Sequence, residues 1–200
     1  LSAIEDQLVS TGLFDVLRCI DAPEVTDKQL LRVHTAGHLD YIKSMMPQSG
    51  YSRLDPDTVI APDSLPAARR AAGSVVEAVD LGLSGAVDDA FCCVRPPGHH
   101  AESDRAMGFC LFNNIAVGAA HALEEHGLER VAIVDFDVHQ GNGTEEMFAD
   151  EDRVLFCSTL SLLSSNRSIP PVNYLMDEGR EIVAGSEEIS INEVGPIPFH

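Results

Sequence analysis

Residues 130–143 read RVAIVDFDVHQGNG, an apolar run that passes directly into acids, a histidine and two glycines. The part from 130 to 137 predicts a buried strand, because short apolar runs bounded by turn residues are typical of parallel sheets. On an extended segment, residues two apart lie on one face, so Asp135, Asp137 and His139 are expected to point the same way. The carboxyl end of this strand is therefore the first candidate for a functional site.

The flanking segments alternate between strand and helix patterns. Apolar runs at 90–94 and 154–158 predict two further strands. The pattern of 111–125 predicts a helix that Gly127 ends, and a short helix is expected at 144–148. The order strand, helix, strand, helix, strand is typical of an α/β fold with a central parallel sheet that helices cover.

The first part of the chain has mainly helical patterns. A helical stripe over 1–17 is interrupted near Gly12, and residues 26–29 fit a capping box that opens another helix. A short helix is expected at 38–46, and a long one over 64–79, where a serine and a proline mark its start.

The acidic strand end carries side chains that suit a metal ion. Buried carboxylates require a cation or hydrogen-bond donors. A carboxylate together with an imidazole suits zinc, whose catalytic sites usually take three protein ligands and leave one position for water. A strand end with solvated acids is the alternative that this motif alone leaves open.

A second signal, RPPGHH at 95–100, follows the expected strand at 90–94. Adjacent histidines on a Pro-Pro-Gly turn are, in isolation, compatible with an exposed loop. A right-handed crossover between parallel strands, however, brings both strand ends to one edge of the sheet. His99 and His100 would then lie beside the metal, where imidazoles that titrate near neutrality can transfer protons.

Charge and cysteine content limit the partners and the compartment. The chain has 32 acidic and 13 basic residues and a formal net charge of -19. Such a surface repels phosphate backbones, so we expect no direct nucleic-acid binding; it suits cationic substrates such as polyamines or lysine-rich tails, or serves only to keep the protein soluble. The five cysteines include no C-x-x-C motif, which is typical of reduced thiols in a cytoplasmic protein. No apolar run is long enough for a membrane span, and a homo-oligomer is compatible with the sequence.

Three motifs, in this order, resemble the central motifs of the histone deacetylase superfamily: PPGHH at 96–100, GFCLFNN at 108–114 and DFDVH at 135–139. The segment LLRVHT at 30–35 is also similar, and the resemblance covers residues 1–159. The superfamily includes acetylpolyamine amidohydrolases and acetoin-utilisation proteins. The resemblance implies a three-layer arginase/deacetylase-like α/β fold and zinc-dependent hydrolysis of the amide of acetyl-lysine or acetylated polyamines.

The resemblance also implies roles for single residues. Asp137 and His139 would be two of three zinc ligands, and His99 and His100 would be the paired histidines beside the zinc-bound water. Asp135 would be the hydrogen-bond partner of His99, and Asn142 that of His100. Gly108 and Phe109 would line the tunnel for the acyl chain. A potassium site would consist of Asp135, Ser158 and Thr159. Asn at position 142 resembles the class II and bacterial branch, and it would leave His100 less basic than an aspartate would.

The sequence departs from the family after residue 159. We find no motif by residue 200 for the family's third zinc ligand, an aspartate, or for its oxyanion-donating tyrosine. The family's N-terminal loop would precede Leu1. We therefore expect a fold that is incomplete at both ends, with part of a deacetylase domain at 1–159 and a divergent tail at 160–200. Three explanations for the missing motifs stay open: the sequence is a fragment, its tail has been altered, or the protein is a degenerate homologue.

Two other functions stay open. A manganese ureohydrolase of the arginase or agmatinase type has a related fold and uses histidine and several aspartate ligands. The pair His99-His100 and the segment 108–109 argue against it. A non-catalytic remnant that acts as a binding module would fit the missing third ligand, and with two ligands we expect weak zinc binding.

Overall fold

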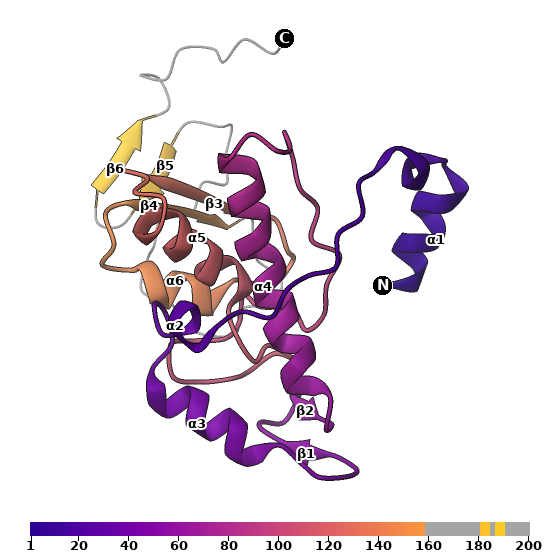
Figure 1. Ribbon diagram of the computed structural model, residues 1–200. Coiled ribbons are helices and arrows are strands. Elements are labelled where there is room, and N and C mark those ends of the chain that lie inside the picture. The colour runs from indigo at the N-terminus through magenta and orange to yellow at the C-terminus, as the bar shows by residue number, and fades with distance from the viewer. Residues whose placement is uncertain (159–180, 185–186, 191–200) are drawn as a thin grey trace.

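A computed structural model describes residues 1–158 together with the backbone of 181–184 and 187–190 (Figure 1). The helices α4 and α5 lie side by side at the centre, the paired strands β3 and β4 lie next to α5, and α1 stands away from the rest. In chain order the elements are α1 (Ser2–Ser10), η1 (Leu13–Val16), α2 (Asp27–Leu30), α3 (Ala36–Met45), β1 (Ser52–Arg53), β2 (Val59–Ile60), α4 (Ser64–Leu83), α5 (Asn114–Glu124), β3 (Val131–Asp135), α6 (Asn142–Phe148), β4 (Val154–Ser158), β5 (Glu181–Ala184) and β6 (Glu187–Ser190).

Local signals set the helix starts in the first part of the chain. The Thr26 side chain accepts a hydrogen bond from the Gln29 backbone, and the Gln29 side chain accepts one from the Thr26 backbone, so the expected capping box is confirmed. The Thr35 hydroxyl caps α3 in the same way. Gly12 has a positive φ of 74° and separates α1 from η1, as the sequence predicts.

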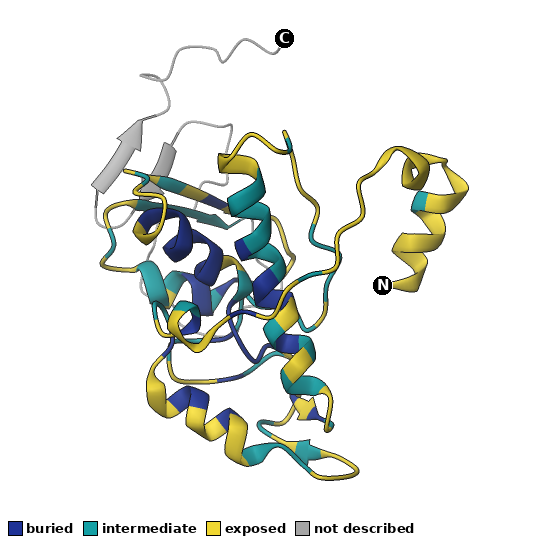
Figure 2. Ribbon diagram, in the orientation of Figure 1, coloured by how far each residue is buried: buried dark blue, intermediate teal, exposed yellow. Residues whose placement is uncertain are grey.

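The core lies between α4, α5 and the segments that cross them. A Cβ at Gly118 would come within 2.4 Å of Val75 Cγ1, so the glycine lets α5 approach α4 closely. Most of α5 is buried, whereas α1 has no buried residue (Figure 2). The core cluster consists of Val25, Leu30, Leu39, Ile42, Ile60, Ala68, Ala72, Val76, Ala106, Leu111, Phe112 and Val117.

The strands β3 and β4 pair in parallel, in register from Val131 opposite Val154 to Asp135 opposite Ser158. Because α6 connects them, the two strands and this helix form the α/β unit that the sequence predicts. The short strands β1 and β2 pair antiparallel, and so do β5 and β6.

The prediction of a strand at 90–94 is wrong. These residues form no strand, and Phe91 is exposed. A strand needs a neighbouring strand for its backbone hydrogen bonds. Within residues 1–158 this segment has only the bond from Val94 N–H to the Cys92 carbonyl, and the Cys92 thiol contacts the Ser74 carbonyl of α4 at 3.5 Å. It therefore runs along α4 as an irregular segment.

The remaining expectations concern the termini and the membrane. The division at residue 159 stays a prediction, since most of 160–200 falls outside the described residues. Among the helices that the structure describes, none has both the length and the apolarity needed to cross a bilayer. The cysteines at 19, 92, 93, 110 and 157 are all free thiols. Burial raises the pKa of Cys110 to about 11, so this thiol stays protonated.

Candidate functional site

The histidine loop is fixed to the N-terminus of α6 through the backbone. The amide groups of Gly143 and Thr144 donate hydrogen bonds to the His99 carbonyl at 3.0 and 3.2 Å. A Cβ at Gly143 would come within 2.1 Å of the Ala101 carbonyl oxygen, so only glycine allows this approach. The loop at 95–100 therefore lies beside the end of β3, although the segment before it is not a strand.

Two hydrogen-bonded pairs lie next to each other at the end of β3. His99 Nδ1 is 2.7 Å from Asp135 Oδ2, and His100 Nδ1 is 2.7 Å from Asn142 Oδ1. The two imidazole rings have centroids 4.1 Å apart. The His99 and Asp135 side chains are only 17% and 12% exposed, so water competes little with their hydrogen bond.

Further contacts of Asn142 fix the tautomer of its partner. Asn142 Nδ2 donates to Glu102 Oε1 at 3.0 Å, which turns the amide oxygen toward His100. His100 Nδ1 must then carry the proton that this oxygen accepts, and Nε2 is left as the proton acceptor. The carboxylate of Asp135 selects the same tautomer of His99. Both rings therefore present an Nε2 that can take a proton.

The different partners move the two histidine pKa values apart. Burial alone lowers the pKa of His99, but the Asp135 hydrogen bond and the charges of Asp135 and Asp137 outweigh it and raise that pKa above its usual value. Burial also lowers the pKa of His100; the neutral Asn142 amide offsets this only in part, and His99 and His139 add repulsion. His99 thus holds a proton more readily than His100.

Asp137 and His139 lie just beyond the end of β3. His139 Nδ1 is 3.0 Å from Asp137 Oδ1, and the His139 backbone amide donates to the same oxygen at 2.8 Å. This backbone hydrogen bond is the main reason why the pKa of Asp137 is lowered. The two side chains are 50% and 63% exposed, and the His139 ring lies 5.9 Å from that of His100, between centroids.

These two side chains fit part of a zinc site. Ligands of a tetrahedral zinc ion at about 2.05 Å lie about 3.3 Å apart, close to the 3.0 Å between Asp137 Oδ1 and His139 Nδ1. Within the part of the chain that the structure describes, no third His, Cys, Asp or Glu atom joins them to form a cluster. The described residues therefore supply two zinc donors of the right chemistry.

The environment of Ser158 fits the expected potassium site. Ser158 lies opposite Asp135 in the β3–β4 register. Its hydroxyl oxygen is buried and has no hydrogen-bond partner among the described residues, which is costly unless a cation or another group contacts it. Thr159, the other residue expected at this site, lies outside the described residues.

Gly108 lies against His100, and Phe109 follows it in the chain. A Cβ at Gly108 would come within 2.4 Å of His100 Cδ2, and Gly108 has a φ of 57°. Phe109 also has a positive φ, 67°, which is unusual for a bulky residue, and its amide donates to the Thr58 hydroxyl at 3.0 Å. The Phe109 ring is exposed.

Sequence reasoning missed Glu102 and Thr58, which orient Asn142 and Phe109. Each acts across a long separation in the chain, 40 and 51 residues, and neither belongs to a motif that announces the contact. It also missed a cluster of Asp80, His121 and His126 between the ends of α4 and α5, for which no spacing pattern gives a signal.

The fold and this site define an α/β protein of the arginase/deacetylase type. The family model of the histone deacetylase domain matches residues 1–182, and the chain therefore belongs to the histone deacetylase family. The crystal structure of the HDA15 HD domain is similar, with a TM-score of 0.73 and 43% identity over 78% of this chain and 45% of that chain.

Three relatives are named as deacetylases or as a deacetylase-like amidohydrolase. The histone deacetylase-like amidohydrolase of Pseudomonas aeruginosa is 45% identical over 148 residues, which cover 74% of this chain and 39% of that protein. Histone deacetylase 5 of Arabidopsis thaliana is 45% identical over 168 residues (79% and 25%). Polyamine deacetylase HDAC10 of Homo sapiens is 37% identical over 164 residues (79% and 24%). The chain thus spans well under half the length of these relatives.

Proposed function

We propose that this chain belongs to a zinc-dependent deacetylase that hydrolyses the amide of acetyl-lysine or of acetylated polyamines. The observation that carries the proposal is the pairing of His99 with Asp135 and of His100 with Asn142, with the rings 4.1 Å apart, beside the donors Asp137 and His139. The names of the relatives support a deacetylase, and none of them is a ureohydrolase.

Asp137 and His139 would hold the zinc ion. When bound, zinc would polarise the acyl carbonyl and lower the pKa of its water. The neutral member of the histidine pair would accept a proton at Nε2, and a histidine of the pair would donate one to the leaving amine. Because Asp135 is charged and Asn142 is not, the pair can hold one proton on His99 and keep His100 neutral.

Substrate selection would depend on Phe109 and on charge. The exposed ring of Phe109 would contact the alkyl chain of an acyl-lysine or acyl-amine. The net charge of -19 favours a substrate with further amines and disfavours nucleic acid. A potassium ion held by Asp135, Ser158 and Thr159 would fix the strand ends. A cytoplasmic location and a homo-oligomer stay predictions.

The test is a His100→Ala variant of the 200-residue chain, assayed on acetyl-lysine peptide and acetylspermidine with zinc added. We expect turnover to fall by at least about 100-fold, because general acid–base groups contribute about 10²–10⁴-fold, while the zinc content stays that of the parent chain. The exposed Tyr51→Ala variant is the control and should retain parent activity. Full activity of His100→Ala would contradict the assignment.

A binding module is the second candidate, because the described residues supply two zinc donors where catalytic sites usually have three. Zinc stoichiometry distinguishes the two functions, with Asp137→Ala as the reference. One zinc per chain more in the parent than in Asp137→Ala supports the deacetylase. Binding of acetylated peptide or polyamine that does not change when zinc is removed supports the module.

A further inference from the structure

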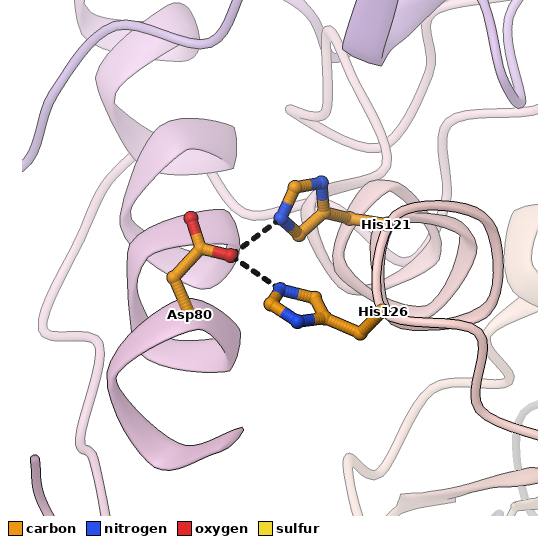
Figure 3. Close-up of side chains that lie close together, drawn as sticks. All are labelled: Asp80, His121 and His126. Atoms are coloured by element: carbon orange, nitrogen blue, oxygen red, sulfur yellow. Dashed lines mark hydrogen bonds and ion pairs between the residues drawn. The ribbon is translucent and has the colours of Figure 1, made fainter. Parts of the chain in front are cut away.

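A second cluster of metal-ligating side chains lies where the ends of α4 and α5 meet (Figure 3). Asp80 belongs to the last turns of α4, His121 to the last turn of α5, and His126 to the turn that follows α5. The close contact between Gly118 and Val75 fixes the two helices less than two turns away. The cluster therefore rests on a rigid pair of helices.

The two imidazoles face one carboxylate oxygen. His121 Nε2 is 2.7 Å and His126 Nε2 is 2.6 Å from Asp80 Oδ1, as the dashed lines in Figure 3 show. The three ligand atoms all lie within 4.8 Å of one another. His121 is buried, whereas Asp80 and His126 are partly exposed, so an ion can reach the cluster from solvent.

We propose that Asp80, His121 and His126 bind a divalent transition-metal ion such as zinc, separately from the candidate active site. Two imidazole nitrogens and one carboxylate oxygen are a ligand set that suits zinc, nickel and copper. The ion replaces the two ring protons that now point at Asp80, and its ligands separate to about 3.3 Å. Because Asp80 and His126 are partly exposed, they can move by this fraction of an ångström.

Arg32 opposes binding in the metal-free form. Its Nη1 lies 2.6 Å from His121 Nδ1, and since a guanidinium only donates, the proton of His121 stays on Nε2, where the ion binds. A metal at Nε2 places that proton on Nδ1, facing a second donor. Arg32 also pairs with the exposed Glu125 at 2.7 Å, and we infer that it turns wholly to Glu125 when the ion binds.

The first experiment measures zinc binding to the 200-residue chain in an Asp137→Ala/His139→Ala background, which removes the donors of the candidate active site. Competition with a chromophoric chelator gives the stoichiometry. We expect one zinc per chain, lost in His126→Gln and in Asp80→Asn, together with a zinc-dependent rise in Tm that both variants lose. No zinc in the background chain, or retention of zinc in a folded His126→Gln variant, would overturn the proposal. The result does not depend on the proposed deacetylase activity.

The second experiment tests the role of Arg32 in the same background. Arg32→Gln supplies an oxygen that can accept the Nδ1 proton, whereas the matched Arg32→Lys keeps a donor. Partners of this kind change metal affinity by about 10–100-fold. We therefore expect zinc to bind at least about 10-fold more tightly to Arg32→Gln than to Arg32→Lys. Equal affinities would contradict the role assigned to Arg32.

Discussion

The two halves of the candidate active site differ in how the described residues hold them. The histidine-pair half consists of His99, His100 and their partners Asp135 and Asn142, and it is fixed by backbone contacts to α6. The metal-donor half consists of Asp137 and His139, which are 50% and 63% exposed and contact mainly each other. The groups proposed for proton transfer are thus held by the fold, whereas the proposed metal site would rely on two exposed donors.

The contact with the largest expected effect is the backbone approach at Gly143. Gly143→Ala would place a Cβ 2.1 Å from the Ala101 carbonyl oxygen and force the histidine loop away from α6. We expect the free energy of unfolding to fall by about 3 kcal/mol, measured by urea denaturation. Gly82→Ala is the matched control, because no atom lies within 4 Å of its Cβ position. Equal effects of both variants would show that the loop is not held at this point.

The second prediction concerns pH and His34, a buried histidine that belongs to neither half. His34 is buried, and its Nε2 accepts a hydrogen bond from the Asn113 amide at 2.9 Å, so it must stay neutral. Burial, and to a smaller extent the neighbouring His38, lower the pKa of His34 from 6.5 to about 3. The unfolded chain therefore binds the proton first, and the stability that is complete above pH 6.5 is lost as the pH falls toward 3.

At pH 5 this histidine should cost the fold about 2 kcal/mol relative to pH 7. His38, whose pKa burial also lowers, acts in the same direction. Urea denaturation of the parent and of His34→Gln at both pH values measures the effect. The variant should be less stable at pH 7 but should lose less stability between pH 7 and pH 5. An equal loss in both proteins would show that His34 is not the group responsible.

The third prediction separates the two halves directly. Asp135→Asn removes the charged partner of the half-buried His99 and should cost about 1–2 kcal/mol of stability. Asp137→Asn changes an exposed side chain and should cost less than about 0.5 kcal/mol, yet it should abolish zinc binding at the candidate site. Denaturation and zinc stoichiometry of both variants give the comparison. A larger stability loss for Asp137→Asn would reverse our description of the halves.

The parts of the fold that could be predicted from the sequence depend on local signals. The capping box at Thr26 and the break at Gly12 need only their own neighbours, and both are confirmed. The runs that form β3 and β4 are apolar and bounded by turns, and the structure pairs them in parallel. Motif order was enough to indicate the family, since long motifs are rarely shared by chance.

The parts that could not be predicted depend on partners distant in the chain. The run at 90–94 has the composition of a strand, but a strand exists only where another strand pairs with it. Glu102 orients Asn142 across 40 residues, and Arg32 contacts His121 across 89. Neither contact can be recognised from the local sequence around the residues that form it. The roles expected of Asp137, His139 and the potassium site stay predictions until an ion is measured.

The last prediction, which has the smallest expected effect, compares His99 and His100 within the histidine-pair half. Asn142→Asp gives His100 a charged partner like that of His99 and should raise the pKa of His100, which NMR of its ring protons measures. The new carboxylate faces Glu102, which now accepts a hydrogen bond from Asn142 Nδ2, so the fold should lose up to about 1 kcal/mol of stability. Adding Glu102→Gln should restore that stability while most of the rise in pKa persists. If the pKa of His100 does not move in either variant, the neutral Asn142 amide is not the reason for its low pKa, and burial together with repulsion by His99 and His139 must explain it.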